Sequence, residues 1–182
     1  MHIRDPNGSE AVVDTEVDKL LNDFADQDSI AREVRLVGKA LGRAGRGEKV
    51  MQLHDYNVET HPGAVEAMWS QVDMFAMYVG DGNDLTAEDW AVADVAVEKL
   101  LSVFAGNPKL AKAIRQVGKR YNAAGRSDKA VELWGMNVDN SPNNVDAMLS
   151  QMDLIYSYIE GNDVNDAIVD GEVDSVCPAA LT

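Results

Sequence analysis

The chain repeats itself, and this internal repeat limits what it can fold into. When the sequence is shifted by 80 positions, Val17–Asn83 aligns with Val97–Asp163 without a gap, with 26 identities in 67 positions. The shared residues include glycines, asparagines and prolines at Gly45 and Gly125, Asn57 and Asn137, and Pro62 and Pro142. A repeat of this size indicates a solenoid, in which each unit buries its apolar face against its neighbours.

Apolar residues recur at helical spacing and no stretch alternates cleanly with period two, so we expect an all-α fold. Val13, Val17 and Leu20, for example, share one stripe of the first helix, opposite a row of acids. Proline and glycine clusters end the helices, and Thr86 with Asp89 has the capping-box pattern that begins one. About nine helices are predicted, at 10–26, 30–44, 48–59, 63–79, 87–104, 109–124, 128–140, 143–159 and 166–176.

The composition is strongly acidic, with 31 Asp and Glu against 16 Lys and Arg and a net charge of −15. Such a charge repels nucleic acids and anionic lipids, so a neutral or basic protein partner is favoured. Adaptation of the surface to salt is an alternative reason for the acidity. The 46% hydrophobic content indicates a folded, soluble chain, and a single cysteine, Cys177, excludes an internal disulfide. We find neither a bilayer-spanning apolar stretch nor a secretion signal, which leaves the localisation open.

The repeat also predicts a domain organisation. One solenoid domain is expected at 10–176, with copy 1 at about 11–84, copy 2 at about 91–164 and a truncated third copy at 166–176. Residues 1–9 and 177–182 are expected to be disordered or derived from a vector. The chain begins and ends partway through helix pairs, from which we expect a segment of a longer repeat protein.

With these residues in view, the chain resembles a divergent tetratricopeptide repeat, a helix-turn-helix unit of about 34 residues. Its pattern of glycines, large and small residues and a final proline is matched, from Ala31 as position 1, by Gly38, Leu41, Gly45, Val50, His54, Asn57 and Pro62. From Ala111 it is matched more fully by Gly118, Tyr121, Gly125, Ala130, Trp134, Asn137 and Pro142. Asparagine in place of a small residue, and a long loop at Gly80–Thr86, depart from the pattern.

The resemblance implies antiparallel helix pairs stacked into a right-handed superhelix, whose first helices line a concave groove that binds peptides or protein partners. Groove positions carried over from the family place alternating basic and acidic rows on successive first helices. The groove residues implied in this way are Arg32, Arg35, Lys39, Arg43, Trp69, Asp73, Lys112, Arg115, Lys119, Asn122 and Tyr156.

The groove cations have two interpretations. They can bind an extended peptide that carries a carboxylate, with Arg35, Lys39, Arg115 and Lys119 as donors. Alternatively they pair with acids of the neighbouring first helix, Glu66 and Asp73, and need no ligand. The set matches only part of the carboxylate clamp that some tetratricopeptide domains carry. We therefore expect a non-catalytic interaction module for a peptide or protein, or alternatively a structural spacer; the oligomeric state stays open.

Other sites are less supported by the residues. Acids and amides in two turns, Asp81, Asn83, Asp84 and Glu88, and Asp163, Asn165, Asp166 and Asp170, could bind calcium, but without the EF-hand spacing. His54 and His61 are seven positions apart without a cysteine nearby, which disfavours zinc. The glycines of Gly42–Lys49 are similar to a phosphate-binding loop, but a hairpin turn explains them. No cofactor and no catalytic constellation is predicted.

Overall fold

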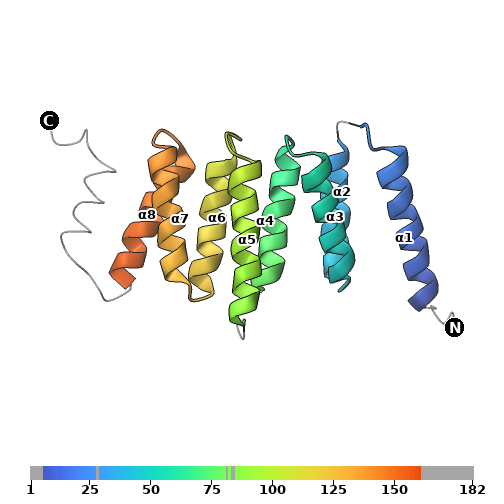
Figure 1. Cartoon of the computed structure of the whole chain (residues 1–182), viewed down its shortest axis with the longest axis horizontal. Coiled ribbons are helices and arrows are strands. Elements are labelled where there is room, and N and C mark those ends of the chain that lie inside the picture. Colours follow the sequence, from blue (N-terminus) through green and yellow to red (C-terminus); the bar gives the residue numbers. More distant parts are fainter. Residues whose placement is uncertain (1–5, 28, 81, 83–84, 161–182) are drawn as a thin grey trace. The chain divides into compact units, whose positions relative to one another are not determined.

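The structure is a computed structural model that describes residues 6–27, 29–80, 82 and 85–160, and within these residues it contains helices and no strand. Figure 1 shows the helices in chain order. The eight helices of the described residues are α1 (Pro6–Asp23), α2 (Ile30–Arg43), α3 (Gly47–Thr60), α4 (Val65–Val79), α5 (Ala87–Val103), α6 (Leu110–Ala123), α7 (Ser127–Asn140) and α8 (Val145–Glu160). The predicted all-α class is thereby confirmed.

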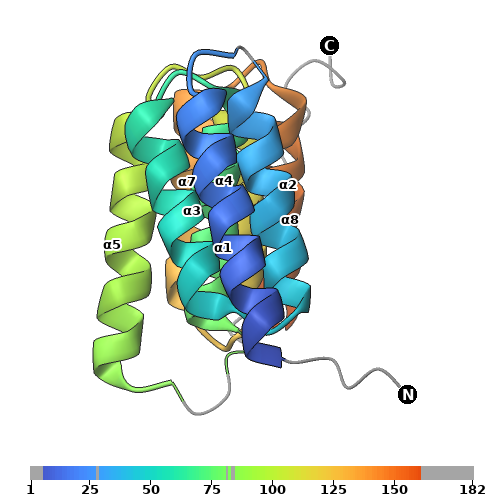
Figure 2. The same ribbon diagram turned by 90° about the vertical axis from the view of Figure 1, so that its right-hand side faces the viewer.

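The chain divides into two compact units, residues 1–70 and 71–182, and each is described by itself. In unit 1, α2 and α3 form an antiparallel hairpin, and α1 packs on α2 (Figure 2). The core of this unit is formed by Val17 of α1 together with the buried residues of α2 and α3, which are Ile30, Val34, Leu41, Val50 and Leu53.

In unit 2, α6 and α7 form the equivalent hairpin, and α8 packs against both of these helices (Figure 1). Phe75 of α4 and Tyr121 of α6 meet in the core of this unit, with ring centroids 4.9 Å apart. Gln71 of α4 is buried, and its Nε2 donates a hydrogen bond to the carbonyl of Ala96 in α5 at 2.8 Å. The aromatic contact therefore joins the second part of α4 to α6, and the buried amide joins it to α5.

The same glycine turn joins the helices of both hairpins. Gly45 and Gly125 have φ angles of 76° and 79°, a left-handed conformation that side chains with a Cβ avoid. The N–H groups of Arg46 and Arg126 reach back to the carbonyls of Leu41 and Tyr121, at 3.0 and 2.8 Å. This is the Schellman motif, which satisfies the last carbonyls of a helix and reverses the chain.

A buried asparagine connects the two helices of each hairpin with the helix that follows them. Nδ2 of Asn57 donates to the carbonyl of Ala31 at 2.8 Å and to Oγ of Ser70 at 2.9 Å. Nδ2 of Asn137, 80 positions later, makes the same two bonds to Ala111 and Ser150, at 3.0 and 2.8 Å. The asparagines that depart from the tetratricopeptide pattern thus hold the second helix of a pair to its own first helix and to the next one.

Most helix ends lie within two residues of their predicted positions, and the capping box of Thr86 and Asp89 is confirmed. Helix α1 differs, because it begins at Pro6 and so includes part of the segment expected to be disordered. Proline suits the first turn of a helix, where an N–H would have no helical partner. The ninth helix, predicted at 166–176, lies outside the described residues, and the right-handed superhelix stays a prediction. No helix of the described part has both the length and the apolar character needed to cross a bilayer.

Candidate functional site

Most of the predicted groove residues of unit 2 lie on α6 and α8, where the carboxylate of one acid contacts two cations. Arg115 donates through Nε to Asp153 at 2.7 Å and through Nη2 at 3.4 Å. Nζ of Lys119 lies 3.4 Å from the same carboxylate. The side chain of Asp153 is 14% exposed and that of Arg115 21%, whereas Lys119 is 49% exposed. The two-pronged Arg115 contact therefore joins α6 to α8, and Lys119 remains the accessible cation of this cluster.

Unit 1 has a related pair between α2 and the beginning of α4. Nη1 of Arg35 donates to Glu66 at 2.9 Å, with side chains 17% and 35% exposed. The guanidinium of Arg35 also lies over the ring of Trp69, 5.9 Å from its centroid. Lys39 of α2 and Asp73 of α4 have interaction partners as well. The interpretation that the groove cations pair with acids of the next first helix is therefore observed for Arg35 and Arg115.

The remaining predicted groove residues are mostly open to solvent. Arg32, Arg43 and Lys112 are exposed, and Arg32 contacts only its sequence neighbour Glu33, at 2.9 Å, among the contacts that the structure gives for it. Asn122 accepts a hydrogen bond from Ser127 at 2.7 Å. Tyr156 of α8 is 55% exposed. These accessible side chains, together with Lys119, are the predicted residues that can still contact a partner.

Helix α8 also carries an exposed apolar stripe, which the sequence reasoning did not single out. Its members recur at helical spacing and are between 39% and 67% exposed: Val145, Met148, Met152, Tyr156 and Ile159. Their counterparts 80 positions earlier include Met68, Val72 and Val79, which are at most 3% exposed. The residues that follow α8, with the predicted helix at 166–176, lie outside the described part of the chain.

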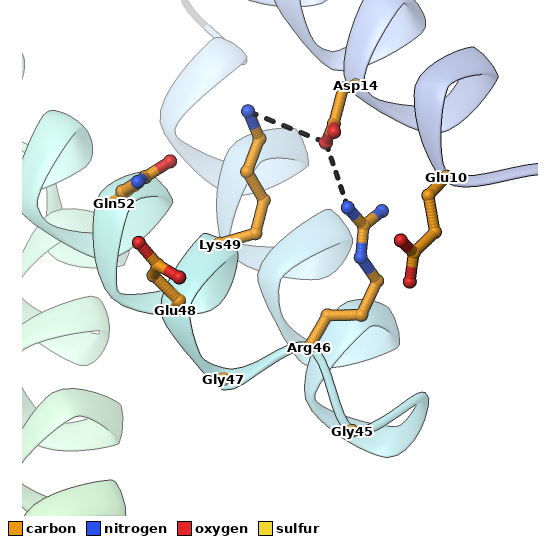
Figure 3. Close-up of a pocket in the computed structure, with 8 residues that line it drawn as sticks. All are labelled: Glu10, Asp14, Gly45, Arg46, Gly47, Glu48, Lys49 and Gln52. Carbon is orange, nitrogen blue, oxygen red and sulfur yellow. Dashed lines mark hydrogen bonds and ion pairs between the residues drawn. The ribbon is translucent and has the colours of Figure 1, made fainter. Parts of the chain in front are cut away.

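A polar pocket of about 440 Å³ lies between α1 and the turn that joins α2 to α3. Figure 3 shows that Arg46 and Lys49 both approach Asp14 of α1. Nη2 of Arg46 is 3.1 Å from this carboxylate and Nζ of Lys49 is 3.6 Å from it. The sequence interpretation treated this stretch as a hairpin turn alone. A comparison of the residues that differ between the two copies could have revealed the pocket.

The equivalent place in unit 2 contains an aromatic cluster. Trp90 of α5 lies over the guanidinium of Arg126, 5.1 Å from ring centroid to Cζ, and stacks on Tyr121 with centroids 5.8 Å apart. The Tyr121 hydroxyl donates to Asp94. Burial raises the pKa of this hydroxyl above its ordinary value, and the Asp94 carboxylate adds to the effect because it stabilises the protonated form. In unit 2 the rings of Trp90 and Tyr121 occupy this place, and a smaller pocket of about 110 Å³ borders Tyr121 and Asp94.

The metal sites that the sequence allowed gain no support. Among the described residues there is no group of three or more potential metal ligands. Most of the turn acids considered for calcium lie outside these residues. His54 is buried beneath Gly38, where a Cβ would come within 2.9 Å of the imidazole, and His61 contacts the ring of Tyr56 edge-on. Both histidines therefore have packing roles.

Comparisons with known proteins add little to this description. No protein-family model matches the chain, and no curated protein matches it. Among solved structures, one described as the crystal structure of MamA is similar, with a TM-score of 0.49 and 16% sequence identity over 96% of this chain and 95% of that one. A similarity at this level supports no conclusion about function, which must be argued from the chain's own residues.

Proposed function

We propose that the chain is a non-catalytic interaction module that binds an acidic segment of a peptide or protein along the surface formed by α6 and α8. The single observation that carries the proposal is that α6 has exposed cations and α8, which contacts it, has an exposed aromatic ring, in a chain of net charge −15. Lys112 and Lys119 lie on α6, and Tyr156 lies on α8. A strongly acidic protein that keeps cations accessible on one helix has a local site for anionic groups.

The paired residues have a positioning role in this proposal. Asp153 holds Arg115 by a two-pronged contact, and this fixes the guanidinium and joins the two helices that present the surface. Lys119 shares the same carboxylate but is about half exposed, so a carboxylate of the partner can approach it from the solvent side. Exposed ion pairs contribute under about 1 kcal/mol, so exchange of Lys119 from Asp153 to a partner costs little.

The tetratricopeptide-like helix pairs support the same proposal. First helices that lie side by side expose a row of positions to a partner, and α6 and α8 are in contact in unit 2. A structural spacer is the alternative function, and the internal pairing of Arg35 and Arg115 favours it, because these two residues already have their partners. The two functions differ in whether any peptide binds.

A peptide array distinguishes them. Peptides with acidic, amidated neutral and basic sequences are tested against the wild type and against Lys112→Glu/Lys119→Glu. The proposal expects acidic peptides to bind and the double reversal to abolish their binding. Arg120→Glu is a matched control, since Arg120 is an exposed cation of α6 outside the predicted groove positions. Absence of binding by every peptide class would support the spacer instead.

A further inference from the structure

The pocket beside α1 can be compared with its counterpart because the 80-residue correspondence continues to the start of α1. Asp14 corresponds to Asp94, Arg46 to Arg126 and Lys49 to Lys129. These residues line the pocket of unit 1 and surround the aromatic cluster of unit 2. The two places therefore have the same acid, the same arginine and the same glycine turn.

The two places differ at the positions that fill them. Unit 2 has Trp90 over Arg126 and Tyr121 beneath the indole. The corresponding positions of unit 1 are Glu10 and Leu41, so neither the indole nor the phenol has a counterpart. The pocket of about 440 Å³ is lined by Glu10, which stands where unit 2 has Trp90, and by Arg46, which corresponds to the Arg126 that Trp90 covers.

The loss of the tyrosine changes the hydrogen bonds of the acid and the arginine. Asp94 accepts a hydrogen bond from the Tyr121 hydroxyl, whereas Asp14 accepts one from Arg46 instead. Nη1 of Arg46 is buried, and no described residue accepts a hydrogen bond from it. A buried donor without an acceptor is unfavourable, and the arginine of unit 1 is therefore less well satisfied by its surroundings than a fully hydrogen-bonded one.

From these observations we infer that the pocket binds an aromatic side chain, tryptophan in particular, from a partner polypeptide, with the ring stacked on the guanidinium of Arg46. Arginine stacks on aromatic faces, and Trp90 on Arg126 is the example within the same chain. The pocket lies in unit 1 and shares no residue with the surface of α6 and α8. The inference rests on the proposed function only because it takes a polypeptide as the partner.

The pocket is lined by charges of both signs, which favour a neutral occupant over a free anion. Glu10, Asp14 and Glu48 line it and repel a free anion, although the beginning of α3 is at its edge. Arg46 and Lys49 already contact Asp14, which reduces the attraction of the pocket for a free cation. A neutral ring that uses the face of the guanidinium avoids the repulsion by the acids, because it needs no net charge.

The test is an NMR titration of the full chain with N-acetyltryptophanamide. We expect a dissociation constant of about 1 mM. The largest chemical-shift changes should occur at the backbone amides of Gly45, Arg46 and Gly47, because the ring current of a bound indole acts on them. N-acetylalaninamide lacks the ring and is expected to leave these amides unchanged. Shifts of the same amides with inorganic phosphate, and none with the tryptophan derivative, would identify an anion site and overturn the inference.

Two variants test the stacking. Arg46→Lys keeps the positive charge near Asp14 but removes the planar group, and we expect binding at least about fivefold weaker. Glu10→Trp supplies the ring from the chain itself and is expected to block the pocket, whereas Glu16→Trp, at an exposed position of α1, is expected to leave binding intact. Unchanged affinity in both Arg46→Lys and Glu10→Trp, with unchanged circular dichroism, would contradict the inference.

Failure of this inference can be separated from failure of the proposed function. If acidic peptides bind the α6 and α8 surface but the tryptophan derivative does not shift the amides of the turn, only the pocket inference fails. If the derivative binds the turn and no acidic peptide binds, only the proposed function fails. The variants for the two sites share no residue.

Discussion

Replacement of Asn137 by alanine is expected to destabilise unit 2 strongly, because this side chain is fully buried and holds three helices together. Two hydrogen bonds are lost, at about 1 kcal/mol each. The missing amide leaves a cavity of roughly 40 Å³, which at about 24 cal/mol per Å³ adds about 1 kcal/mol. The expected loss in the free energy of unfolding is therefore about 3 kcal/mol.

A double-mutant cycle with Ser150 isolates the contact between α7 and α8. The Ser150 hydroxyl accepts a hydrogen bond from Asn137 and donates one to the carbonyl of Asp146, at 3.0 Å, so Ser150→Ala removes two bonds and is expected to cost about 2 kcal/mol. Each single variant already removes the bond between Asn137 and Ser150, so the double variant loses this bond only once. We therefore expect the two effects to be coupled by about 1 kcal/mol.

Urea unfolding followed by circular dichroism measures these changes. A lower midpoint concentration of urea, at an unchanged dependence of the free energy on urea, reports the loss of stability. Asn140→Ala, an exposed asparagine at the end of the same helix, is the control and is expected to change stability by less than about 0.5 kcal/mol. A loss below about 1 kcal/mol for Asn137→Ala, together with zero coupling to Ser150, would refute the assignment of Asn137 as the connection between helices.

Three further predictions test packing, capping and the relation between the two units. Gly118→Ala places a Cβ 2.3 Å from Nε1 of Trp134, so we expect the free energy of unfolding in urea to fall by about 1 to 3 kcal/mol. Gly135→Ala is the control, because a Cβ at Gly135 has nothing within 4 Å, and it should stabilise α7 by up to about 1 kcal/mol. The backbone hydrogen bond from Thr86 lowers the pKa of Asp89, so its contribution to stability is present above the unfolded pKa of about 3.9 and is lost as the pH falls through the folded value. The protection factors of the amides at the start of α5 should therefore fall below pH 4, and no such fall is expected in Asp89→Asn. Glu10→Trp/Leu41→Tyr recreates the aromatic cluster in unit 1, and a rise in the thermal midpoint is expected; an unchanged or lower midpoint would show that the two places are not equivalent.

The helices and their turns were predictable because their signals are local. Glycine at Gly45 and Gly125 marks the left-handed turn, and the capping box of Thr86 and Asp89 lies within four residues. Such features depend only on nearby backbone geometry, and the sequence shows them directly.

The contacts between helices were not predictable in the same way. Asn57 and Asn137 were visible only as departures from the tetratricopeptide pattern, since their partners on the next helix are 13 residues away. The cation rows were predicted, but two interpretations of them were left open, and the choice for Arg115 depended on the distance to Asp153, 38 residues away. Such distances follow from helix packing rather than from local sequence.

The pocket was not predicted from the sequence, because the repeat is recognised by the residues that its two copies share. Its information lies in two differences, Glu10 against Trp90 and Leu41 against Tyr121. A glycine turn between two helices explained the shared residues fully, so nothing in the turn itself indicated a space beside it.

The most direct test of the proposed function is chemical-shift mapping of a bound acidic peptide on the full chain. The proposal predicts that the largest changes fall on α6 and α8, at Lys112, Lys119 and Tyr156, and that they disappear in Lys112→Glu/Lys119→Glu but persist in Arg120→Glu. Changes confined to other helices, or a map that the double reversal leaves unchanged, would contradict the proposed binding surface.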